Sequence, residues 1–182
     1  MRARLAAMVA TGTCVTLAAV TGVVLAAGPG SASPDGLDRV RQATARYHDL
    51  SVAKADGFAE LRDAADIACI DKPGAGGMGI HYVLGARVGD PAIDAAKPEL
   101  VIYAPGKDGR LKLAAVEYVV LAADWFDAGH DSPPSLFGHE FTLVPVGNRY
   151  GLPPFFELHA WVWDTNKSGQ FADYNPHVVC PA

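Results

Sequence analysis

The sequence lacks the short motifs that identify several enzyme classes. It contains no Gly-x-Ser-x-Gly elbow of a serine hydrolase, no His-Glu-x-x-His of a zinc protease and no Cys-x-x-Cys pair. The glycine-rich stretch at 74–79 is not followed by Lys and Ser or Thr, which excludes a phosphate-binding loop. No motif therefore assigns a reaction, and whether the protein is an enzyme stays open at this point.

Charge is nearly absent from the N-terminal region, where Arg2 and Arg4 are the only charged residues before position 35. A long apolar stretch follows them and ends in small residues up to Ala32, which is the pattern of a secretory signal peptide. We predict a signal peptide over 1–32 and a secreted protein with a single domain over 33–182. An uncleaved membrane anchor is the alternative, but the many Ala, Thr and Gly residues favour cleavage.

Basic residues are too few to form a surface for nucleic acid. The chain has 15 Lys and Arg against 20 Asp and Glu, and removal of 1–32 takes away two arginines and no acid. The mature chain then carries a formal charge of −7. Such a charge disfavours nucleic acid and anionic membranes as partners. A small-molecule ligand is compatible with it, and the composition does not indicate an oligomeric state.

Cysteine is sparse, with three residues in the whole chain. Cys14 lies inside the N-terminal apolar stretch, and more apolar sequence follows it, so it does not fit a lipid-attachment site. Cys69 and Cys180 remain after cleavage, and an even number in an exported domain predicts a disulfide bond. A loop of this length would stabilise the fold by about 4–5 kcal/mol in the chain-entropy model. Two separate thiols are the alternative, which an oxidising compartment disfavours.

Hydrophobic spacing changes along the mature chain from helical to alternating. Apolar residues between Leu37 and Leu61 recur at roughly helical spacing, so we predict a helix over 36–56 that ends before Gly57. A second helical turn is expected at 58–65, and a loop at 71–77. Strands are then expected at 78–84, 100–103, 111–121 and 155–163, with a short edge strand at 141–146.

One helix followed by four or five strands predicts an α+β fold, with the N-terminal helix packed on an antiparallel sheet. The segments 100–103 and 111–121 are close enough in the chain to form a hairpin across the turn at 106–109. A small β-barrel or half-barrel with one helix is the alternative arrangement of the same strands.

The strand predicted at 155–163 has one polar face. Because alternate residues of a strand share a face, the even-numbered residues from 156 to 162 form one wholly apolar face that belongs to the core. The opposite face carries Glu157, His159, Trp161 and Trp163. Two tryptophans beside an acid and an imidazole indicate the wall of a cavity, so we predict that Trp161 and Trp163 line a ligand pocket.

Glu117 is unusual because its same-face neighbours in the strand at 111–121 are apolar. A carboxylate in such a stripe is unfavourable unless it is paired, protonated or coordinated. His81, in the strand at 78–84, has the small residues Gly79 and Val83 as same-face neighbours, which leaves room beside its ring.

Two imidazoles and two carboxylates on neighbouring strands predict a divalent-metal site made of His81, Glu117, Glu157 and His159. Zinc, iron and manganese all accept such ligands. The expected function is metal binding by a secreted protein, with a binding, oxidative or hydrolytic role left undefined. The main alternative is a non-enzymatic interaction module in which these residues form a structural network with contacts of about 2.7–3.2 Å, and a metal-free pocket for a small organic ligand is a further one.

Four segments together resemble a family of small exported bacterial proteins of unassigned function. They are GMGIHYV, AVEYVV, YGLPPFFELHAWVW and GQFADYNPHVVC, which span the chain from Gly77 to Cys180. The resemblance implies that the two histidines and two glutamates within these segments act as one set. It does not imply an activity, because the family has none to transfer.

Overall fold

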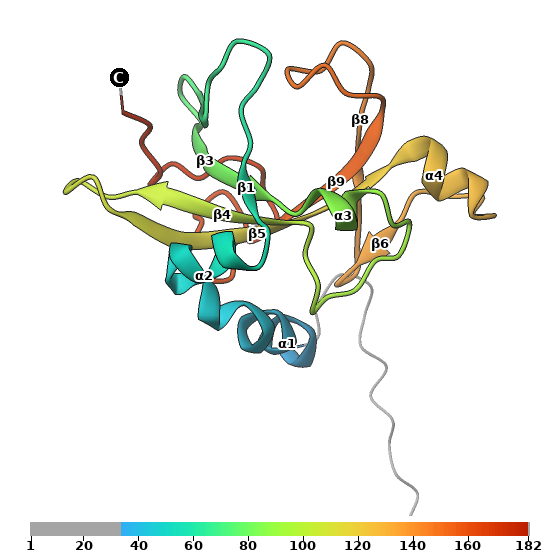
Figure 1. Ribbon diagram of the computed structural model, residues 1–182, viewed down its shortest axis with the longest axis horizontal. Coiled ribbons are helices and arrows are strands. Elements are labelled where there is room, and N and C mark those ends of the chain that lie inside the picture. Colours follow the sequence, from blue (N-terminus) through green and yellow to red (C-terminus); the bar gives the residue numbers. More distant parts are fainter. Residues whose placement is uncertain (1–33, 182) are drawn as a thin grey trace, which may run out of the picture.

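An antiparallel sheet covered on one face by the N-terminal helices forms the centre of the molecule (Figure 1). The structure is a computed structural model and describes residues 34–181, so the predicted signal peptide over 1–32 and Cys14 lie outside the described residues. The α+β fold predicted from the sequence is confirmed. Within 34–181 the two ends of the sheet do not pair with each other, so the alternative of a barrel is wrong.

Seven strands of the described region form the sheet, in the order β1-β3-β4-β5-β9-β8, with β2 paired to β3 outside this path. Every pairing is antiparallel. The strands are β1 (Ala59–Glu60), β2 (Cys69–Lys72), β3 (Gly76–Val83), β4 (Leu100–Pro105), β5 (Leu111–Leu121), β8 (Thr142–Val144) and β9 (Phe155–Ala160). The predicted hairpin is β4 and β5, and the predicted edge strand is β8. A separate small hairpin contains β6 (Ser135–Leu136) and β7 (His139–Glu140).

The N-terminal helix predicted over 36–56 is divided into three pieces, α1 (Pro34–Thr44), the 3-10 helix η1 (Ala45–His48) and α2 (Leu50–Ala55). Asp49 causes the second break, because its side chain accepts a hydrogen bond from the Ser51 amide and caps a new helix there. The helical turn predicted at 58–65 is wrong, since this segment contains β1 instead. Two short helices follow later in the chain, α3 (Gly85–Val88) and α4 (Ala122–Asp127).

Tyrosine and valine side chains fill the space between the helices and the sheet. Val40, Tyr47 and Phe58 belong to the same buried cluster as Tyr103 and Tyr118 of the sheet. The Tyr103 hydroxyl donates a 2.6 Å hydrogen bond to the carbonyl oxygen of Tyr47, which joins the helical layer to β4. This face of the sheet is therefore the main hydrophobic core, and α1 and α2 lie on it in Figure 1.

The C-terminal segment is bonded to strands β2 and β3 of the sheet. The predicted disulfide is confirmed, since Cys69 at the start of β2 is bonded to Cys180, 111 residues later. The Gly77 amide lies 2.9 Å from the carbonyl oxygen of Val178, and the Asn175 amide donates to Gly77 at 2.9 Å. A side chain at Gly76 would collide with the backbone of Asn175, so the glycine-rich start of β3 is needed for this close approach.

Strand β9 ends three residues earlier than predicted, at Ala160. Its last paired residue faces Val116, and the backbone then turns, with the Trp161 amide donating to Gln170 and the Trp163 amide to Ala114. The alternation of faces stops where the ladder stops. As a result Trp163 points to the helix side, where its Nε1 donates to Thr44 Oγ1 at 3.0 Å.

None of the helices within 34–181 combines the length and the apolar character needed to cross a bilayer.

Candidate metal centre

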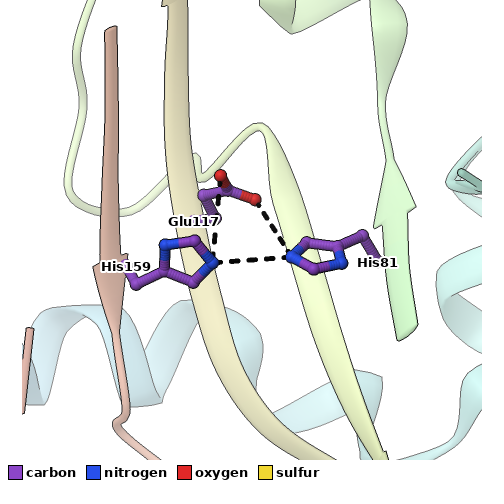
Figure 2. Close-up of side chains that lie close together, drawn as sticks. All are labelled: His81, Glu117 and His159. Carbon is purple, nitrogen blue, oxygen red and sulfur yellow. Dashed lines mark hydrogen bonds and ion pairs between the residues drawn. The ribbon is translucent and has the colours of Figure 1, made fainter. Parts of the chain in front are cut away.

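Three of the four predicted ligands meet on the sheet face opposite the helices. Glu117 of β5 and His159 of β9 are direct partners in the strand ladder, and His81 lies on β3, beyond the intervening β4. Figure 2 shows the two imidazole rings pointing toward each other with the Glu117 carboxylate beside the gap between them. The period of two along each strand places all three side chains on one face.

The distances between the ligand atoms are too long for a hydrogen-bonded network. His81 Nε2 lies 3.5 Å from His159 Nε2 and 3.5 Å from Glu117 Oε2, and His159 Nε2 lies 3.9 Å from Glu117 Oε1. Good hydrogen bonds between such groups span about 2.7–3.2 Å. Two ligands of a tetrahedral ion with bonds of about 2.1 Å are about 3.4 Å apart. The side chains are thus spaced like ligands around one common point.

All three side chains are buried. His81 is 2 % exposed, Glu117 4 % and His159 0 %. Burial lowers the pKa of His81 to about 4, with Arg149 adding to the effect, and burial lowers the pKa of His159 to about 3, with His81 adding to it. Both imidazoles are therefore neutral at neutral pH and offer a lone pair, which is the form that binds a metal.

The carboxyl of Glu117 experiences the opposite shift. Burial raises its pKa well above the usual value for glutamate, and the neighbouring Glu157 raises it further. No basic side chain forms an ion pair with Glu117 among the described residues, apart from contacts to the two neutral imidazoles. A bound cation would favour the ionised form of Glu117 and would balance the negative charge of its carboxylate.

Glu157, the fourth predicted ligand, belongs to a second group that shares His159. Ligand atoms of Glu157, His159 and Asp173 all lie within 4.8 Å of one another, as do those of His81, Glu117 and His159. Burial raises the pKa of Glu157 to about 7, and Asp173 contributes to this shift. Glu157 thus stands beside Glu117 at the edge of the buried triad, on the side toward the C-terminal segment.

Asp173 was missing from the predicted set. Its Oδ1 lies 3.7 Å from His159 Nδ1, and that nitrogen has no hydrogen-bond partner in the part of the chain that the structure describes. An imidazole that binds a metal through Nε2 carries its proton on Nδ1, and a carboxylate near that proton orients the ring. Asp173 lies in an irregular segment, so no periodicity pointed to it. The motif FADYNP, which contains it, was the available signal.

A cavity of 240 Å³ with a mixed polar and apolar lining borders Glu157 and Asp173 of this group. Its wall includes Glu157, Asp173, Arg149 and Tyr150. Arg149 is held in place by Asp63, whose Oδ2 accepts bonds of 2.9 and 3.2 Å from two guanidinium nitrogens. The cavity therefore exposes Glu157 and Asp173, and not the buried triad itself.

The two tryptophans lie apart from this arrangement. Trp161 is on the same face as His159 but packs against Ile102, and its Nε1 donates to the carbonyl oxygen of Ala172 at 2.6 Å. The prediction that Trp163 shares this face is wrong, because its ring contacts His48 on the helix side at a centroid distance of 4.4 Å. Both rings border one shallow surface depression of 370 Å³, so a ligand pocket at that place stays a prediction.

No protein-family model matches the chain, and comparisons with curated proteins and with solved structures also find no match. The resemblance to exported bacterial proteins therefore stays a prediction. Any function has to be argued from the geometry and chemistry of the site itself.

Proposed function

We propose that this protein binds one divalent metal ion through His81, Glu117 and His159, with Glu157 as the fourth ligand. The observation that carries the proposal is the convergence of two neutral imidazole nitrogens and a carboxylate in a buried place, at separations of 3.5–3.9 Å. Among the ions that accept histidine and glutamate, zinc fits these near-tetrahedral separations best, and iron and manganese are the alternatives.

The competing interpretation is a structural network without a metal. Such a network would satisfy its buried polar atoms with short hydrogen bonds. The triad does not do so, since its Nε2 atoms and the Glu117 oxygens lie 3.5–3.9 Å apart. Replacement of the proton on Glu117 by a divalent cation gives the carboxylate and both Nε2 atoms a common partner.

Export of the protein is a further part of this proposal. The Cys69–Cys180 disulfide supports it, because such bonds persist in oxidising compartments. Mass spectrometry of secreted material should give an N-terminus near Ser33. Recovery of the chain with Met1 intact from a membrane fraction would instead support an uncleaved anchor.

The metal site is tested with protein purified without chelator and with chelator-treated protein reloaded separately with zinc, iron and manganese. Elemental analysis should find about one equivalent of metal per chain. His159→Ala should remove most of it, because the ion loses one of only three or four protein ligands, and Glu117→Gln should weaken binding because it removes the charge. His177→Ala is the matched control, since that side chain is exposed on a loop away from the cluster.

A protein that stays metal-free after exposure to all three ions would contradict the proposal. In that case His159→Ala and Glu117→Gln would act on stability alone, by about 1–3 kcal/mol each, as expected when a buried polar contact is broken.

A further inference from the structure

An apolar cavity of 260 Å³ opens on the same sheet face, directly beside the metal triad. Its floor is formed by Val83, Leu100 and Val119 of three adjacent strands. Val83, Leu100 and Glu117 are cross-strand partners in one row, and Val119 follows Glu117 by two residues, so the floor lies on the face that carries the ligands. Leu61, Leu152 and Phe155 complete the apolar wall.

Glu117 is the one charged side chain that lines this cavity. It is also the central ligand of the proposed metal site, so the ion would lie at the polar end of an otherwise hydrophobic space. Small-molecule sites have this construction, with a mostly apolar lining and a few polar groups that fix the orientation of the ligand.

The volume limits the size of what can enter. An apolar cavity of about 150 Å³ is enough to hold benzene. The 260 Å³ available here therefore suits a ring or a branched chain with a short substituent. Larger ligands are excluded unless the loop that carries Leu152 moves.

We propose that this cavity binds a small, largely apolar organic acid whose carboxylate is directed at the metal ion held by Glu117. The inference rests on the proposed metal site, because no basic side chain of the described residues lines the cavity, so without the ion an organic anion would find only the carboxyl of Glu117 there. The apolar part of the ligand, in contrast, needs only the hydrophobic walls. The two parts can therefore be tested separately.

Two probes separate these contributions. Toluene tests the apolar walls alone, and phenylacetate adds a carboxylate to a ring of the same size. Calorimetry and NMR titration should show toluene binding to both metal-free and zinc-loaded protein, and phenylacetate binding to the zinc-loaded protein only. In protein loaded with cobalt, phenylacetate should also change the visible absorption of the ion, because its carboxylate takes the place of Glu157 as the fourth ligand.

Variants that fill the cavity locate the binding. Val88 lines it and is partly buried, and Leu152 lies at its rim and is 40 % exposed. Val88→Phe and Leu152→Trp should each lose both probes while keeping one equivalent of zinc. Val146→Phe is the matched control, because Val146 is 72 % exposed and lies outside the cavity lining. Leu152→Trp changes a surface position, so it keeps the test valid if Val88→Phe does not fold.

The outcomes distinguish this inference from the proposed function. Protein that holds one equivalent of zinc but binds neither probe overturns the inference alone. Binding that survives in both filling variants overturns it as well, since the probes then sit elsewhere. Protein that takes up no metal overturns the metal site and the inference together.

Discussion

The two faces of the central sheet treat buried polar groups in opposite ways. On the helix-covered face, buried polar atoms have short hydrogen bonds, such as the Tyr103 hydroxyl to the Tyr47 carbonyl at 2.6 Å and the Tyr118 hydroxyl to the Ala95 carbonyl at 2.8 Å. On the other face, His81, Glu117 and His159 are equally buried but have no contact shorter than 3.5 Å with one another. The same strands supply both faces, so the difference comes from the choice of side chains and not from the backbone.

This difference suggests that one face of the sheet stabilises the fold and that the other carries the proposed functional site. The helix face contributes the hydrophobic burial that stabilises the fold, and the opposite face contains polar groups that are unfavourable until a partner binds. If this division is right, substitutions on the helix face should act on stability regardless of metal. The face that carries His81, Glu117 and His159 is called the metal face. Substitutions on it should change stability by an amount that depends on whether metal is present.

The largest expected effect on stability is that of removing the disulfide, which links the C-terminal segment to β2. Cys69→Ser together with Cys180→Ser should lower the free energy of unfolding by about 4–5 kcal/mol, because the bond closes a loop of more than 100 residues. Denaturant titrations of both proteins measure this, and added reductant should affect only the wild type. Two free thiols per chain in denatured wild-type protein without reductant would contradict the bond.

The next largest effect on stability is expected from a substitution that creates a cavity in the core on the helix face. Phe156 is 2 % exposed in the main core, and Phe156→Ala should lower the free energy of unfolding by about 3–5 kcal/mol, with or without zinc. Leu143→Ala is the control on the neighbouring strand. Leu143 pairs with Phe156 but is 52 % exposed, so its loss should change stability by about 0.5 kcal/mol at most. A loss for Phe156→Ala that depends on zinc would break the division between the faces.

The matching change on the metal face is Glu117→Leu, for which we expect a reversal of sign. In chelator the variant should be more stable than the wild type by about 1–3 kcal/mol, because an apolar side chain replaces a carboxyl that is buried in an apolar stripe. With zinc at about 100 times its dissociation constant, the wild type should gain about 2.7 kcal/mol and the variant should not respond. Thermal and denaturant unfolding in both conditions measure the reversal, and a variant less stable than the wild type in chelator would argue for a structural role of Glu117.

A smaller effect is expected from Asp173, which acts through His159. Asp173→Asn should weaken zinc binding by about tenfold, the low end for a carboxylate behind a metal-binding histidine, because Asp173 Oδ1 lies 3.7 Å from His159 Nδ1 and does not form a short hydrogen bond with it. The stability of the metal-free protein should change little, since Asp173 lies in an irregular, partly exposed segment. Asp131→Asn, on an exposed loop, is the matched control for calorimetric titrations. Equal affinities for the two variants would remove Asp173 from the site.

A further expected effect is the pH dependence of zinc binding, which changes affinity without any substitution. With pKa values of about 4 and 3, His81 and His159 are already neutral above about pH 5 and do not compete with zinc. The carboxyls do compete, because their raised pKa values keep them protonated; for Glu157 the value is about 7. Affinity should therefore rise up to about pH 7, by about tenfold per pH unit for each proton displaced.

A comparison with Glu157→Gln identifies the source of these protons. Calorimetry in buffers of different ionisation enthalpy counts the protons released per ion. The variant should release fewer and should show a flatter profile between about pH 5 and pH 7. An unchanged profile would mean that Glu157 releases no proton and that Glu117 or the histidines are the source.

The strand register explains how much of the site could be predicted from the sequence. The period of two correctly placed His81, Glu117 and His159 on one face, because each lies well inside a paired strand. The same rule failed at Trp163, which lies beyond the last paired residue of β9, where nothing enforces the alternation. The limits of a strand depend on partners elsewhere in the chain, so local sequence does not define them.

Several structural features depend on contacts between distant parts of the chain, which the local sequence pattern does not predict. Strand β2 lies partly in a segment predicted to be a loop because of its Pro and Gly residues, and pairing with β3 decides its conformation. Asp173 reaches His159 because the bonds of Asn175 to Gly77 hold its segment against β3. The helical layer was correct in position, but the break at Asp49 required recognition of a cap inside an apparently continuous pattern.

The 111-residue separation of the disulfide also sets an order of events during synthesis. Chains are made at about 5–20 residues per second, so Cys69 waits on the order of ten seconds for Cys180 to appear. From residue 33 onward the sequence contains only these two cysteines, so in that interval no other cysteine of this region can capture Cys69. Strands β3 to β9 are all complete before the bond can form. The crosslink therefore closes on a sheet whose proposed metal ligands have already been made, and within the region from residue 33 onward it cannot trap a shorter, incorrectly folded loop.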